Sequence, residues 1–232
     1  MADMSGFGVI FDMDGTIIDN EVLSISMFKD FFKEQNVIFN NDIVKACMGA
    51  KDGLWTAILK FNPKADIESL REGLKEYRSK RPLNYKELMR PNMKVLLKGL
   101  KERGFKVAVA SSTSMAGVKR NLTQCEIFDE FHTIVSGDMI VMGKPNPEIY
   151  LYCCEKLGLE PENCIAIEDS QNGLISAKKA GMKAIALTDR HFGFDLSSAD
   201  RIMDFSDLTV EKIEHILMKD KNQISIKNFR RP

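Results

Sequence analysis

The feature that most constrains the fold is a short apolar run near the start of the chain that ends in two carboxylates. Residues 9–11 are Val-Ile-Phe, Asp12 and Asp14 follow them, and Gly15 and Thr16 come next. Such a run is typical of a buried strand, and glycine permits a sharp turn after it. Carboxylates at the carboxyl end of a strand lie where α/β sheets bind ligands. Two carboxylates this close repel each other unless a cation or a proton lies between them, so the segment indicates a metal site.

Beyond residue 85, strands and helices alternate. Apolar runs at 106–110, 133–136, 164–167 and 184–187 predict strands, and helical periodicity between them predicts helices. This alternation is typical of a parallel sheet with helices on both faces. We therefore predict an α/β fold with a Rossmann-like, doubly wound parallel sheet.

A helical region separates the first strand from the others. Residues 18–84 contain four stretches of helical periodicity and no β-rich run, and Asp19, Asn20 and Glu21 offer capping residues for the first helix. We expect an inserted α-helical cap domain of four helices at 18–84. The predicted core domain then comprises 1–17 and 85–220, and 221–232 form a basic tail.

Composition narrows the possible partners. Basic and acidic residues balance at 33 each, so nothing suggests a nucleic-acid or membrane surface. No apolar run approaches the roughly 18 residues of a membrane span. The residues before the acidic pair do not form a basic segment followed by an apolar stretch and a cleavage site, so we expect no leader segment. The five cysteines form no Cys-x-x-Cys pair, so no zinc or redox motif is indicated. We expect a cytoplasmic protein with a small-molecule partner, and a monomer is the default expectation.

Polar groups follow several of the predicted strands or lie in the loops beside them. They are Asp12 with Asp14, Ser111, Lys144, and Glu168 with Asp169. In a doubly wound sheet these positions face one crevice. A hard cation such as Mg2+ prefers oxygen ligands, and a carboxylate can act as a nucleophile toward phosphorus. A lysine and a metal together would offset charge on the phosphoryl oxygens, so the set indicates a phosphoryl-transfer site.

These motifs resemble those of the haloacid dehalogenase-like (HAD) hydrolase superfamily, in its β-phosphoglucomutase and phosphoglycolate phosphatase-like branch. The first motif is the segment 12–16, the second is Ser111, the third is Lys144 in Gly-Lys-Pro, and the fourth is Glu168-Asp169. Any one of them alone would fit an ordinary turn or helix cap. Their joint occurrence, in order and in the expected strand or loop context, makes the resemblance specific.

The resemblance implies a catalytic role for several residues. Asp12 would be the nucleophile, and Asp14 would protonate the leaving oxygen and later activate water. Ser111 and the amide of Ser112 would hold the phosphoryl oxygens, while Lys144 would neutralise nucleophile and phosphoryl group. An aspartate two positions after the nucleophile favours phosphoryl transfer over dehalogenation, because the acid is needed only when the leaving group takes a proton.

The resemblance also implies how Mg2+ and substrate are bound. The side chains of Asp12 and Asp169 and the backbone carbonyl of Asp14 would bind the metal, with Glu168 as a ligand or a water-mediated partner. In the cap, Lys51 is a candidate for binding a distal anion of the substrate, and a solvated loop lysine is an equally good interpretation.

We predict a Mg2+-dependent phosphatase that hydrolyses a small phosphorylated metabolite, a sugar phosphate, through an aspartyl-phosphate. The main alternative is a β-phosphoglucomutase-type mutase, whose relatives carry a histidine on the first cap helix where this chain has Ser24. A more distant alternative is a non-catalytic binding protein of the same fold, which the complete set of motif carboxylates and lysine disfavours.

Overall fold

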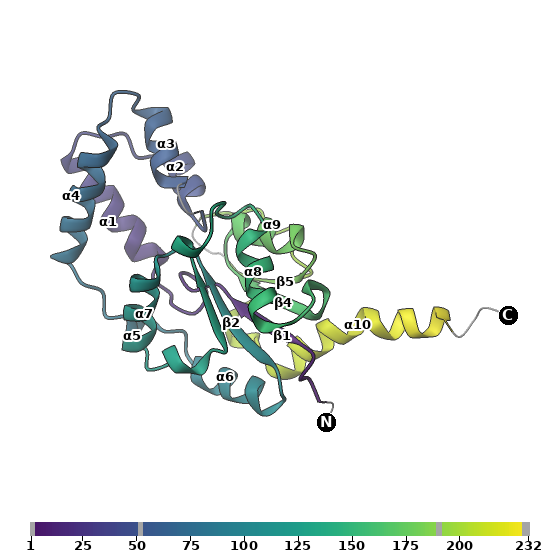
Figure 1. Cartoon of the computed structure of the whole chain (residues 1–232). Coiled ribbons are helices and arrows are strands. Elements are labelled where there is room, and N and C mark those ends of the chain that lie inside the picture. Colours follow the sequence, from purple (N-terminus) through teal and green to yellow (C-terminus); the bar gives the residue numbers. More distant parts are fainter. Residues whose placement is uncertain (1–2, 51–52, 189–191, 229–232) are drawn as a thin grey trace.

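The computed structural model describes residues 3–50, 53–188 and 192–228, and from residue 220 onward it describes only the backbone. Figure 1 shows a parallel sheet wrapped by helices, with a separate lobe of helices beyond one end of its strands. The chain enters this lobe directly after the first strand and then returns to build the rest of the sheet.

The sheet has six parallel strands in the order β3-β2-β1-β4-β5-β6, which confirms the predicted α/β fold. The strands are β1 (Gly8–Phe11), β2 (Lys106–Ser111), β3 (Thr133–Ser136), β4 (Cys164–Glu168), β5 (Lys183–Leu187) and β6 (Arg201–Met203). The sequence did not predict β6, because a three-residue strand with two exposed positions carries little apolar pattern. Because β1 lies between β2 and β4 in the centre of the sheet, the residues that follow these three strands lie next to one another at the carboxyl ends of the strands.

Helices cover both faces of the sheet. On one face α6 (Met93–Glu102), α7 (Met115–Gln124) and the start of α10 (Val210–Asn228) share an apolar cluster with Val9 and Phe11. On the other face α8 (Glu148–Leu157) and α9 (Gln171–Lys179) pack with Ile10 against a surface of strand alanines. The alternation of β1 side chains between the two clusters is the period-two pattern of a strand buried on both sides.

The helical lobe has an apolar core of its own. Its helices are α1 (Glu21–Glu34), α2 (Asn41–Cys47), α3 (Gly53–Phe61) and α4 (Ile67–Ser79). Phe31, Phe32, Ile58 and Leu74 are among the buried residues of this core, and Trp55 packs against them. This separate cluster supports the proposed division into a cap at 18–84 and a core at 1–17 and 85–220. It does not fix the residues at which the cap begins and ends. A short helix that the sequence did not predict, α5 (Tyr85–Leu88), follows the lobe.

The last helix extends into the segment predicted as a basic tail. α10 continues to Asn228, so the backbone of most of 221–232 is helical. None of the described helices combines the length and apolar character that crossing a bilayer requires.

Candidate active site

The ends of the three central strands bring the predicted core residues together. Phe11 is in register with Val109 of β2 and Ile167 of β4, so the chain leaves β1, β2 and β4 at one edge of the sheet. The residues gathered at that edge are Asp12, Ser111, Glu168 and Asp169, joined by Lys144 from the loop between β3 and α8; all five are at most 5% exposed. Four segments far apart in sequence therefore form one buried polar site, as the motif positions indicated.

Lys144 lies at the centre of this site. Its Nζ is 2.5 Å from Asp12 Oδ1 and 2.6 Å from Glu168 Oε1, and it donates a hydrogen bond of 3.0 Å to the Ala110 carbonyl. Burial alone would lower the pKa of Lys144, but the two carboxylates outweigh it and raise that pKa above its ordinary value. Lys144 is therefore a fixed positive charge beside Asp12.

Glu168 is held by donors on every side. Oε1 accepts from Lys144 and from the Tyr150 hydroxyl at 2.7 Å, while Oε2 accepts from the Ser170 hydroxyl at 3.0 Å and from the amides of Asp169 and Ser170. Sequence reasoning missed Tyr150, because its position inside an apolar helix face gives no sign of a polar contact. This network fixes the position of Glu168 and, through it, that of Lys144.

The remaining carboxylate charge exceeds what Lys144 can balance. Ligand oxygens of Asp12, Glu168 and Asp169 lie within 4.8 Å of one another. Asp169 Oδ1 accepts a hydrogen bond of 3.0 Å from Thr16, but its buried Oδ2 has no hydrogen-bond partner. An unpartnered buried carboxylate oxygen costs free energy, and a set of carboxylates suits a hard divalent cation. The residues present therefore fit a metal ion.

The pKa values of Asp12 and Asp169 agree with a site that holds more carboxylate charge than Lys144 can neutralise. Burial, together with Glu168 and Asp169, raises the pKa of Asp12 well above its ordinary value in spite of Lys144. Burial and the neighbouring Glu168 likewise raise the pKa of Asp169 to about 7, although hydrogen bonds with Glu21 and Thr16 and the charge of Lys144 act to lower it. A bound cation would favour the ionised form of both groups.

The side chain of Asp14 is held by two residues outside the recognised motif positions. Asn20 Nδ2 donates to Oδ1 at 2.7 Å and Thr113 Oγ1 donates to Oδ2 at 2.9 Å, while Asn20 Oδ1 accepts from the Gly15 amide. Asn20 is the N-cap residue of α1, but its side chain makes no capping hydrogen bond, contrary to expectation. Thr113 could have been suspected from the hydroxyl-rich run that begins at Ser111.

A loop of the helical lobe contacts the core beside the site. The Ser112 hydroxyl donates to the Gly49 carbonyl and Asn172 Nδ2 donates to the Met48 carbonyl, both at 2.9 Å. The sequence predicted a role for the backbone amide of Ser112. The contact of its hydroxyl group with the Gly49 carbonyl was not predicted. Ser111 Oγ accepts from the Thr113 amide at 3.1 Å. Lys51, the predicted cap residue for a distal anion, lies outside the described residues.

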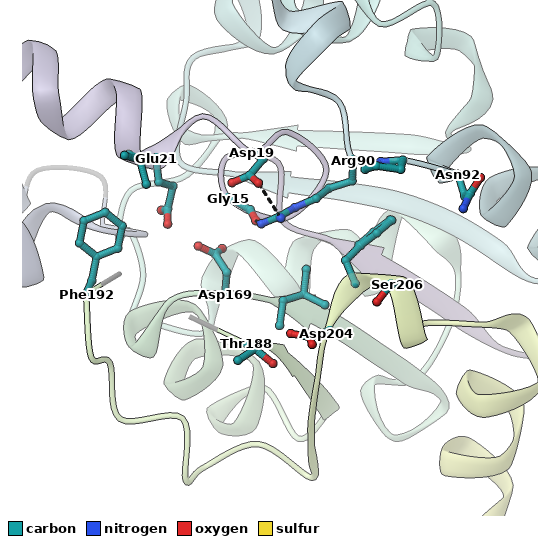
Figure 2. Close-up of a pocket in the computed structure, with 14 residues that line it drawn as sticks. Gly15, Asp19, Glu21, Arg90, Asn92, Asp169, Thr188, Phe192, Asp204 and Ser206 are labelled. Atoms are coloured by element: carbon teal, nitrogen blue, oxygen red, sulfur yellow. Dashed lines mark hydrogen bonds and ion pairs between the residues drawn. The ribbon is translucent and has the colours of Figure 1, made fainter. Parts of the chain in front are cut away.

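A cavity of about 380 Å³ adjoins the site on the side of β5 and β6. Asp169 and Glu21 line it, together with Arg90, whose guanidinium pairs with Asp19 at 2.7 Å and donates to the Gly15 carbonyl at 2.8 Å (Figure 2). Arg90 follows the helical lobe in the chain and Asp19 precedes it, so this ion pair joins the two connections between lobe and sheet.

Comparison with known proteins places the chain among hydrolases. The family model for haloacid dehalogenase-like hydrolases matches residues 9–187. The phosphorylated carbohydrates phosphatase of Thermotoga maritima is 30% identical, over 76% of this chain and 82% of that protein. The β-phosphoglucomutase of Bacillus subtilis is also 30% identical, over 88% and 92%.

The fold is shared as well. The crystal structure of β-phosphoglucomutase from Clostridium difficile matches with a TM-score of 0.80 at 21% identity, covering 94% of this chain and 98% of that one. The family match spans β1 to β5 and contains Asp12, Ser111, Lys144 and Asp169, which the fold brings to one buried site. The chain therefore belongs to the haloacid dehalogenase-like hydrolase family.

Proposed function

We propose that this chain is a Mg2+-dependent phosphatase that hydrolyses a small phosphorylated sugar through an aspartyl-phosphate on Asp12. The general class follows from the family and its phosphatase relatives: the chain is a phosphoric monoester hydrolase. The observation that carries the finer proposal is the position of Asp12, which contacts the buried Lys144 and has a carboxylate oxygen within 4.8 Å of one from Asp169.

The first step transfers the phosphoryl group to the enzyme. A carboxylate oxygen of Asp12 attacks phosphorus, the bond from phosphorus to the ester oxygen breaks, and Asp14 gives its proton to the departing alcohol. Lys144 offsets negative charge next to Asp12 without itself exchanging a proton. Ser111, oriented by the amide of Thr113, is placed to donate to a phosphoryl oxygen.

The second step returns the enzyme to its starting state. Asp14 removes a proton from water, the water oxygen attacks phosphorus, and the bond to Asp12 breaks to release inorganic phosphate. Asn20 and Thr113 hold the Asp14 carboxylate in both steps. Because both of its oxygens accept hydrogen bonds, the direction in which Asp14 can transfer its proton is restricted.

Asp12 and Asp169 are the proposed side-chain ligands of Mg2+, and the Asp14 carbonyl remains a ligand implied by the family resemblance. When bound, the metal would offset charge on the phosphoryl oxygens. Glu168 belongs to the same carboxylate group, but its oxygens already accept five hydrogen bonds. We therefore propose that Glu168 acts by positioning Lys144.

The substrate class rests on the relatives and on the helical lobe over the site. A phosphatase of phosphorylated carbohydrates and a β-phosphoglucomutase are both 30% identical to this chain. The family resemblance implies that mutases carry a histidine where this chain has Ser24, and this difference favours transfer to water over transfer to a second sugar hydroxyl. A small phosphorylated metabolite as partner, a monomeric state and a cytoplasmic location stay predictions.

Phosphate release tests the proposal directly. With Mg2+ and p-nitrophenyl phosphate, the wild type should release phosphate and Asp12→Asn should be at least about a hundredfold slower, because amides are poor nucleophiles. A panel of hexose, pentose and glycolate phosphates would identify the substrate class. Equal activity of Asp12→Asn and wild type would overturn the assignment of the nucleophile.

A separate assay decides between phosphatase and mutase. The enzyme is given β-glucose 1-phosphate, Mg2+ and a bisphosphate primer, and both glucose 6-phosphate and inorganic phosphate are measured. We expect phosphate release to be the faster reaction. Faster formation of glucose 6-phosphate would show that the chain is a mutase.

A further inference from the structure

The cavity beside Asp169 contains a second carboxylate that the proposed reaction does not use. Glu21, the first residue of α1, directs its carboxyl group toward that of Asp169 (Figure 2). Gly15 lies close to both groups: a Cβ atom on Gly15 would be 2.1 Å from Asp169 Oδ2 and 2.6 Å from Glu21 Cδ. The two carboxyl groups therefore converge on one point at the edge of the metal-binding group.

Among the described residues, no cationic side chain pairs with either of the two converging carboxyl groups where they face each other. Asp169 Oδ2 is buried and receives no hydrogen bond from a donor group of the described residues, and the side-chain partner of the Glu21 carboxyl group is Asp169 itself, with which it can only share a proton. The nearby Arg90 is directed elsewhere, since its guanidinium pairs with Asp19 and donates to the Gly15 carbonyl. Two carboxylates facing each other in a partly enclosed cavity require a cation, a shared proton or hydrogen-bond donors between them.

A hydrated cation at Asp12 and Asp169 would meet this requirement. Mg2+ keeps several of its water molecules when it binds to proteins, and those waters are strong donors. The cavity of about 380 Å³ has room for them and is bordered by Glu21. Carboxylates that accept hydrogen bonds from the ligands of a metal tune its affinity.

We infer that Glu21 is a water-mediated ligand of the bound metal, contributed by the first helix of the helical lobe. This inference rests on the proposed function, because it takes Asp12 and Asp169 as the direct ligands. Glu21 adds negative charge and hydrogen-bond acceptors without touching the ion. Since Glu21 begins α1, metal binding is thereby linked to the placement of that helix over the site.

Metal affinity, measured apart from activity, tests the inference. Mn2+, which accepts the same oxygen ligands, is titrated into the full-length protein and its free concentration is followed by electron paramagnetic resonance. We expect Glu21→Gln to raise the dissociation constant about tenfold to a hundredfold, the range typical of partners beyond the direct ligands. Asp169→Asn should abolish binding. Glu34→Gln, at the exposed far end of α1, is the matched control and should bind Mn2+ like the wild type.

Thermal unfolding without metal separates a metal-linked role from a structural one. If Glu21 acts through the metal, Glu21→Gln removes a repulsion with Asp169, so the metal-free Tm should be unchanged or higher, and the rise in Tm on adding Mn2+ should be smaller. Glu21→Asp keeps the charge but shortens the reach, and should give an intermediate affinity.

The outcomes distinguish the inference from the proposed function. A wild-type dissociation constant for Glu21→Gln, with binding lost in Asp169→Asn, would overturn the role of Glu21 and leave the metal site in place. A lower metal-free Tm with unchanged Mn2+ affinity would also overturn it, because that is the behaviour of a purely structural residue. Wild-type binding by Asp169→Asn would remove the proposed metal site itself.

Discussion

At the scale of single residues, the site combines chemical groups with neighbours that orient them. The chemical groups were predictable, because carboxylates, a hydroxyl and a lysine directly follow apolar runs or sit in the loops beside them. The orienting residues were not. Asn20 resembles an ordinary helix cap and Tyr150 an ordinary core residue, and only the fold shows that they contact Asp14 and Glu168. Their roles depend on contacts between segments that no local pattern encodes.

Asn20 offers a test at this scale. In Asn20→Ala, Asp14 loses the 2.7 Å hydrogen bond that fixes one carboxylate oxygen, so its proton is less often directed at the leaving group. We expect kcat to fall about tenfold to a hundredfold, within the range that general acid–base catalysis contributes, while KM changes little. Steady-state kinetics check this, with Thr113→Ser as a control that retains the second donor. An equal loss in both variants, or a change confined to KM, would contradict the role.

At the scale of elements, the loop after α2 meets the start of α9 through a glycine. Gly49 has a φ of 68°, and a Cβ atom there would lie 2.2 Å from Ser170 Oγ. Ser170 cannot retreat easily, because its hydroxyl both donates to Glu168 and accepts from the amide of Gly173 in α9. The sequence indicated a loop here, but the close approach to α9 depends on how the lobe is placed on the core.

A pair of glycine substitutions tests this contact. Gly49→Ala and Gly158→Ala both place a side chain in the left-handed region, since Gly158 has a φ of 64°, but nothing lies within 4 Å of the added atom at Gly158. Both should lose about 1–2 kcal/mol of stability through backbone strain. We expect only Gly49→Ala to lower kcat/KM, by about tenfold or more, because the loop can no longer approach the core. Matching kcat/KM values in the two variants would refute this.

Glu126, which follows α7, connects two helices of the core. It pairs with Lys86 of α5 at 2.5 Å and Lys94 of α6 at 2.6 Å, and these hydrogen bonds lower its pKa from 4.5 to about 2. A lowered pKa in the folded state means that the stabilising effect is present above pH 4.5 and is lost as the pH falls toward 2. The Tm difference between wild type and Glu126→Gln should therefore be largest near neutral pH and shrink on acidification. Because all three side chains are exposed, added salt should shrink it as well; a pH-independent difference would exclude this origin.

At the scale of the whole molecule, the chain consists of a sheet-based core with an apolar cluster on each face of the sheet and a helical lobe with a cluster of its own. The alternation of strands and helices predicted this arrangement, because periodicity distinguishes the two kinds of region. A smaller cluster joins α1 and α2 of the lobe to Phe192 and Phe194. What the sequence could not provide is how the lobe lies against the core. That placement depends on a few contacts, such as those of Ser112 and Asn172 with carbonyls of the lobe, whose partners are backbone atoms without a sequence signature.

The separate apolar cluster of the lobe predicts that the lobe can lose structure while the core keeps it. Phe32 is fully buried in the lobe, and Phe32→Ala should cost about 3–5 kcal/mol there. Because the residues that pack around Phe32 all belong to the lobe, amide exchange should accelerate in α1–α4 and stay slow in β1, β2 and β4. In the matched variant Phe11→Ala, whose side chain is equally buried in the core, exchange should accelerate in the strands. Equal acceleration in lobe and strands by Phe32→Ala would mean that the molecule unfolds as one unit, and the proposed division at residues 18 and 84 would then have no energetic basis.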